Sequence, residues 1–133
     1  MLVTRILVIG DDLAMSRAVC RTLHQHGYQV FAGASPREAF EVVRNWSPID
    51  LVVSDFSMPK TQGTQLVRHA CQSLVLRQIV QLRPQTACLS ITAGGIKPAH
   101  APDGMTVLKK PFSRADLIAA VEATLARSGN RQS

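Results

Sequence analysis

The chain has 133 residues, a length that suits one domain with a single buried core. Its 46% hydrophobic and 18% charged residues are ordinary for a folded protein and exclude a disordered one, while 5% aromatic residues predict an aliphatic core. The net charge of +6 favours nucleic acid or an acidic partner only weakly, because the basic residues are scattered along the chain.

The first apolar run, residues 5–9, predicts a buried strand. This run contains Arg5 and continues directly into Asp11 and Asp12, which argues against a membrane span or a signal peptide. We therefore expect a cytosolic protein with no membrane contact. Further strands are predicted at residues 28–32, 49–54, 87–91 and 105–108.

The first helix is predicted over residues 13–25. Met15, Val19 and Leu23 lie four residues apart and form one apolar face, and Gly27 is a typical stop signal.

Two later helices have marked starts. Ser35, Pro36 and Glu38 form an S-P-x-E capping pattern with proline at the first helical position. Ser113 and Asp116 repeat the pattern with aspartate, so a last helix follows.

The remaining helices depart from an even β/α repeat. Helical spacing over residues 66–83 predicts a third helix that runs to Pro84, longer than usual by roughly two turns. Glycines and prolines in residues 93–105 limit the fourth helix to about one turn. We expect a domain over residues 1–127 and a polar tail over 128–133.

This alternation predicts an α/β fold, with five parallel strands in the order 2-1-3-4-5 and helices on both faces. In that order the first and third strands are neighbours, and ligands bind at their carboxyl ends. Those ends carry Asp11, Asp12 and Asp55. Carboxylates about 4 Å apart repel by roughly 4 kcal/mol per pair at a surface-like dielectric, so the pattern predicts a pocket for a hard divalent cation.

Cysteine and histidine do not indicate a second metal site. Cys20, Cys71 and Cys88 are widely spaced, and we interpret them as reduced packing residues. The four histidines lack the i, i+4 spacing of helical ligands.

Thr92 and Lys110 end the fourth and fifth strands, beside the acids. With these residues in place, the chain resembles the receiver domain of two-component response regulators from Arg5 to about Arg127. The matching motifs, in chain order, are DDLAMSR, SDFSMPKTQG, SITAG and KKPF.

The resemblance implies a role for each acid. Asp55 would be the nucleophile that accepts a phosphoryl group from a histidine kinase or phosphotransfer domain. Asp12 and Asp55 would ligate Mg²⁺ together with the backbone carbonyl of Ser57, and Asp11 would act through bound water. An all-oxygen site with few protein ligands suits Mg²⁺.

The resemblance also implies that Lys110 pairs with one phosphoryl oxygen and that Thr92 donates a hydrogen bond to another. The Lys110–Pro111 peptide would be cis, as is usual in the family. Strand alternation turns Lys109 outward. Receivers often carry Tyr or Phe where this chain has Val107, so a ring-based switch is absent.

Alternatives stay open at this point. Taken singly, each acid could cap a helix or start a turn. The missing ring and the broken fourth helix favour a receiver-like scaffold whose partner binding ignores phosphate, and the short fourth helix resembles receivers of hybrid sensor kinases.

Other function classes fit the sequence less well. An aspartyl phosphatase needs a second aspartate where Ser57 stands. No nucleic-acid platform or glycine-rich nucleotide loop appears. The long third helix offers an interface for a homodimer, whereas the downstream partner stays unknown.

Overall fold

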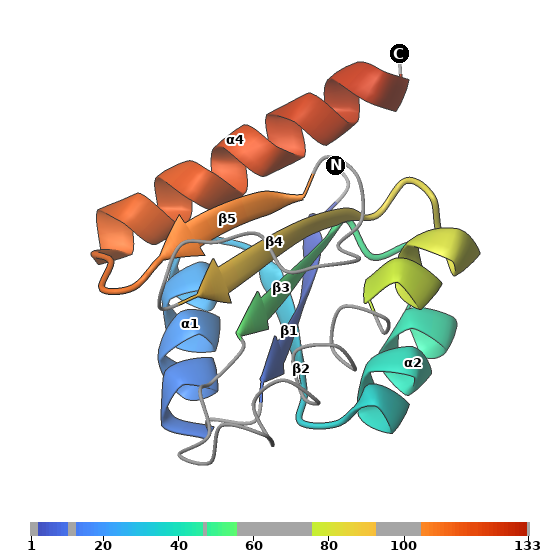
Figure 1. The fold of residues 1–133 in the computed structure, drawn as a ribbon, viewed down its shortest axis with the longest axis horizontal. Coiled ribbons are helices and arrows are strands. Elements are labelled where there is room, and N and C mark those ends of the chain that lie inside the picture. The colour runs from blue at the N-terminus through green and yellow to red at the C-terminus, as the bar shows by residue number, and fades with distance from the viewer. Residues whose placement is uncertain (1–2, 11–12, 47, 56–75, 93–104, 133) are drawn as a thin grey trace.

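The computed structural model describes residues 3–10, 13–46, 48–55, 76–92 and 105–132 (Figure 1). Its strands are β1 (Arg5–Gly10), β2 (Gln29–Gly33), β3 (Leu51–Asp55), β4 (Ala87–Thr92) and β5 (Thr106–Lys109). Its helices are α1 (Leu13–Gln25), α2 (Pro36–Asn45) and α4 (Arg114–Gln132), and residues 76–82 are also helical.

The five strands form one parallel sheet in the order β2-β1-β3-β4-β5. This confirms the predicted fold class and strand order. Strand boundaries differ from the prediction by two residues at most. The order places β1 and β3 side by side in the sheet, although two helices and one strand separate them along the chain.

Helices lie on both sides of the sheet, as predicted (Figure 1). Each face of the sheet buries its own apolar cluster. On one face, Val8, Val53 and Leu89 pack against α1 and α4. On the other face, Val52 and Cys88 pack against α2 and the helical residues 76–82. Consecutive strand residues alternate between these two clusters, and the buried members of both clusters are mainly aliphatic.

The predicted helix boundaries rest on the local chemistry that the sequence indicated. Gly27 ends the turn after α1 with φ of 102°, a conformation that favours glycine. The Ser35 Oγ accepts a hydrogen bond from the Glu38 backbone N–H and caps α2. Ser113 and Asp116 form the reciprocal capping pair of α4.

The carboxyl-terminal helix is longer than predicted. The end of the apolar spacing predicts a polar tail over residues 128–133, but α4 continues to Gln132. Polar residues can continue a helix when no proline interrupts it, and none follows Pro111 in this chain. No helix in the described ranges is long and apolar enough to cross a membrane.

The predicted lengths of the third and fourth helices stay predictions. The third helix begins in residues 66–75 by prediction, and the fourth lies within 93–104, both outside the described residues. Only the predicted end of the third helix falls in a described range, where the Arg83 N–H still bonds to the Ile79 carbonyl at 2.8 Å.

Candidate functional site at the carboxyl edge of the sheet

The carboxyl ends of β1 and β3 meet at the middle of the sheet. Gly10 and Asp55 are partners in the ladder between these strands. Asp11 and Asp12 follow Gly10 directly in the sequence. The positions of Asp11, Asp12 and Ser57 and the side chain of Asp55 lie outside the described structure, so their predicted metal-binding roles stay predictions.

Thr92 ends the neighbouring strand β4 and is 7% exposed. It pairs with Lys109 across the ladder to β5, and its carbonyl oxygen accepts a hydrogen bond of 2.8 Å from the Lys110 backbone N–H. The two residues that the sequence singled out beside the acids are therefore joined through the backbone at the same edge of the sheet.

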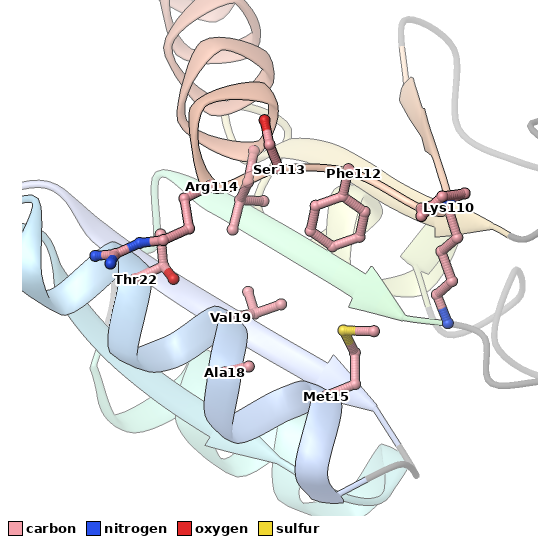
Figure 2. Close-up of a pocket in the computed structure, with 10 residues that line it drawn as sticks. Met15, Ala18, Val19, Thr22, Lys110, Phe112, Ser113 and Arg114 are labelled. Atoms are coloured by element: carbon pink, nitrogen blue, oxygen red, sulfur yellow. The ribbon is translucent and has the colours of Figure 1, made fainter.

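The two adjacent lysines differ in exposure. Lys109 is exposed, whereas Lys110 is half-buried, as strand alternation predicted. The peptide between Lys110 and Pro111 is cis, which agrees with the family resemblance. In Figure 2 the Lys110 side chain extends away from α4 toward the carboxyl edge of the sheet.

A groove with a volume of about 520 Å³ lies beside Lys110, between α1 and the segment that joins β5 to α4 (Figure 2). Its walls are mainly apolar: Met15, Ala18 and Val19 from α1, and Pro111, Phe112 and Leu117 from the opposite side. Figure 2 places the Lys110 side chain at one end of this groove and the Arg114 side chain at the other. A ligand for this groove therefore needs apolar groups and benefits from negative charge at its ends.

Arg114 is held in place at its end of the groove. Its guanidinium donates a hydrogen bond to the Gln25 side-chain oxygen, and Ser113 before it caps α4. Sequence reasoning missed this groove. The signal was present in the repeat of Met15, Ala18 and Thr22, which places small or apolar groups on one face of α1 next to the face that packs into the core.

A row of two serines and one valine lies next to the carboxyl edge of the sheet. Ser54, Ser90 and Val107 are neighbours across β3, β4 and β5, and Ser90 is fully buried. The Ser90 Oγ has no hydrogen-bond partner within the part of the chain that the structure describes. The sequence did not single out Ser90, because one serine in an apolar strand is an ordinary pattern.

The two described cysteines are unpaired and packed, as predicted, whereas Cys71 lies outside the described residues. Burial raises the pKa of the Cys88 thiol to about 12, and burial also raises the pKa of Cys20. Such thiols are poor nucleophiles at neutral pH, because the thiolate is the reactive form. Neither cysteine is therefore a candidate nucleophile at the carboxyl edge of the sheet.

Comparison with known proteins identifies the fold and its relatives. The family model described as the response regulator receiver domain matches residues 6–122. A solved CheY-like receiver domain protein from Methanospirillum hungatei superimposes with a TM-score of 0.74, at 21% identity, over 98% of this chain and 99% of that one. At this identity, the likeness concerns the fold alone.

Two curated relatives differ in how much of their length is matched. Response regulator MprA of Mycolicibacterium vanbaalenii is 32% identical over 124 residues, which are 93% of this chain but 51% of MprA. The receiver protein CpdR of Brucella abortus is 30% identical over 125 residues, which are 91% of this chain and 96% of CpdR. The chain thus spans about half the length of MprA and nearly all of CpdR.

Proposed function

The chain belongs to the response regulator receiver domain family, which acts in two-component signalling, and we propose that it accepts a phosphoryl group on Asp55 from a phosphohistidine donor. In this transfer the P–N bond to the donor imidazole breaks and an O–P bond to an Asp55 carboxylate oxygen forms. The observation that supports the proposal is the meeting of Asp55, Thr92 and Lys110 at adjacent strand ends of one sheet.

The residues at the end of β1 fit the Mg²⁺ that receiver domains generally use. Gly10 is paired with Asp55, so two further carboxylates follow in the chain directly after the ladder partner of the acceptor. Asp12, Asp55 and the Ser57 carbonyl would hold the cation, with Asp11 acting through water, and this set contains only oxygen donors. When bound, the cation neutralises charge on the transferring phosphoryl group.

Lys110 and Thr92 would serve the other phosphoryl oxygens. Phosphoryl transfer passes through a loose transition state with charge on its equatorial oxygens, so catalysis depends on positioned counter-charges. The hydrogen bond from Lys110 N–H to the Thr92 carbonyl couples the strand end that carries the hydroxyl to the segment that carries the ammonium. The role of the chain is to hold these groups in place and to receive the phosphoryl group.

The groove beside Lys110 supplies a docking place for the donor protein. A phosphohistidine must approach the carboxyl edge, and the groove is an apolar surface directly next to it. Arg114 at the far end of the groove favours a donor helix with apolar residues followed by an acidic one, whereas Lys110 at the near end is left to the phosphoryl group. We place this encounter in the cytoplasm, where such a donor would reach the chain.

Incubation with Mg²⁺ and acetyl phosphate, followed by intact-mass measurement and peptide mapping, tests the proposal. Wild type should gain one phosphoryl group, and the peptide that contains Asp55 should carry it. Asp55→Asn is the matched control and should stay unlabelled. A wild-type chain that stays unlabelled, or a label on another residue, would overturn the proposal.

A second candidate function is a receiver-like scaffold that binds its partner regardless of phosphate. Val107 favours it, because this half-buried residue packs against the apolar cluster of the α2 face and has no ring to reorient. Equal partner affinity for wild type and Asp55→Asn under phosphorylating conditions would support the scaffold, whereas a large difference would exclude it.

A further inference from the structure

Ser90 is a buried serine in the core of the sheet whose hydroxyl is unsatisfied within the described ranges. Its side chain is 0% exposed and its Oγ has no hydrogen-bond partner among the residues that the structure describes. A buried hydroxyl without a partner destabilises the state that contains it, because water would have bonded to it in the unfolded chain. A rearrangement that gives the Ser90 hydroxyl a partner removes this cost.

The position of Ser90 connects it to the proposed site. Ser90 lies two residues before Thr92 on β4, so both side chains point to the same face of the sheet. On that face Ser90 stands between Ser54 of β3 and Val107 of β5, which are its partners in the two ladders. Among the core residues of β4, Ser90 is therefore the nearest one to Thr92 on the same face of the sheet.

We propose that Ser90 is a positioning residue for Thr92, an inference that rests on the proposed phosphorylation of Asp55. When the Thr92 hydroxyl turns to a phosphoryl oxygen, it vacates space beside Ser90. Val107 cannot fill that space, because a β-branched side chain has few rotamers. A water molecule enters instead and gives the Ser90 hydroxyl its partner, since a buried site with polar neighbours and room for one water is hydrated. Phosphoryl binding and the hydration of Ser90 therefore favour each other.

Ser90→Ala tests this coupling. The variant keeps the Cβ and removes the hydroxyl, so the unliganded state loses its unpartnered group while the bound state loses a hydrogen bond. Beryllofluoride with Mg²⁺ serves as the phosphoryl mimic, and calorimetric titration measures its affinity. We expect Ser90→Ala to bind the mimic about 5-fold to 100-fold more weakly than wild type, and to unfold at a higher urea concentration than wild type when unliganded.

Ser16→Ala is the matched control. The Ser16 Oγ is the other buried hydroxyl without a partner in the described ranges, but it lies on α1, which packs on the opposite face of the sheet. Its removal should also raise the urea midpoint and should leave the affinity for the mimic within about twofold of wild type. If the loss of affinity were a general effect of removing a buried hydroxyl, both variants would show it. If Ser90 positions Thr92, only Ser90→Ala would bind the mimic more weakly.

Ser90→Cys provides a second variant, because a thiol is a weak donor, and its affinity should fall between those of wild type and Ser90→Ala. The Thr92 amide resonance in NMR spectra should shift on titration with the mimic in wild type and shift less in Ser90→Ala. Unchanged affinity in both Ser90 variants would overturn the inference. A wild-type chain that does not bind the mimic would instead overturn the proposed function.

Discussion

The backbone N–H of Lys110 donates a hydrogen bond to the carbonyl oxygen of Thr92 over 2.8 Å. This contact lies beyond the last ladder pair of β4 and β5, which joins Thr92 to Lys109. It extends the order of the sheet into the segment that carries the proposed phosphoryl ligand. Because the contact uses only backbone atoms, side-chain substitutions at either residue should leave this edge folded.

Lys110→Ala should therefore lose function without unfolding. We expect labelling by acetyl phosphate to slow roughly 10- to 100-fold, the loss that corresponds to one charge-assisted hydrogen bond of about 1.5–3 kcal/mol. The rate of phosphoryl incorporation, followed by intact-mass measurement, gives the readout. Lys109→Ala is the control, since Lys109 is exposed and adjacent, and it should label at the wild-type rate. Equal effects of the two substitutions would contradict the role of Lys110.

Ala18→Trp should separate protein donors from small ones. The indole would fill part of the groove of about 520 Å³ that Ala18 lines. We expect phosphotransfer from a phosphorylated histidine phosphotransfer domain, chosen because it labels wild type, to fall at least about tenfold, as an obstructed interface core would. Labelling by acetyl phosphate should be unchanged, because that donor needs no docking surface. If Ala18→Trp accepted phosphate from the phosphotransfer domain at the wild-type rate, the docking surface would lie elsewhere.

Leu89→Ala should destabilise the fold strongly. Leu89 is 0% exposed on β4 and packs in the cluster beneath α1 and α4. We expect the free energy of unfolding in urea to fall by about 2–5 kcal/mol, the usual cost of this substitution in a packed core. Leu82→Ala makes the same chemical change at a residue that is 47% exposed and should cost less than about 1 kcal/mol. Similar losses in the two variants would contradict the described packing of Leu89.

Cys88 predicts a loss of stability at alkaline pH. Burial raises its pKa from 9.0 to about 12 in the folded chain, so the unfolded chain loses this proton first as the pH rises. The contribution of the neutral thiol is fully present below pH 9 and is lost as the pH approaches 12. Between pH 9 and pH 12, the free energy of unfolding should fall with pH more steeply in wild type than in Cys88→Ala, by about 1.4 kcal/mol per pH unit. Parallel pH profiles of wild type and Cys88→Ala would contradict the burial of the thiol.

The amino-acid sequence by itself determined the fold class, the strand order and most element boundaries. Strand alternation and helical spacing are local patterns, and the capping residues Ser35 and Ser113 act on backbone groups within their own turns. The carboxyl-edge placement of Thr92 and Lys110 was predictable for a related reason, because parallel strands end at the same edge of a sheet. The end of α4 was not, since the polar residues after Arg127 carry no stop signal that decides between helix and tail.

Only the tertiary structure revealed the groove and the buried state of Ser90. The groove is formed by α1 and the start of α4, which are about ninety residues apart in the chain. Ser90 lies between Ser54 and Val107 in the sheet, and its hydroxyl has no partner in the described structure. One serine in an apolar strand does not indicate this state. Cavities and unpartnered hydroxyls depend on which distant groups come together, and a local pattern does not specify that.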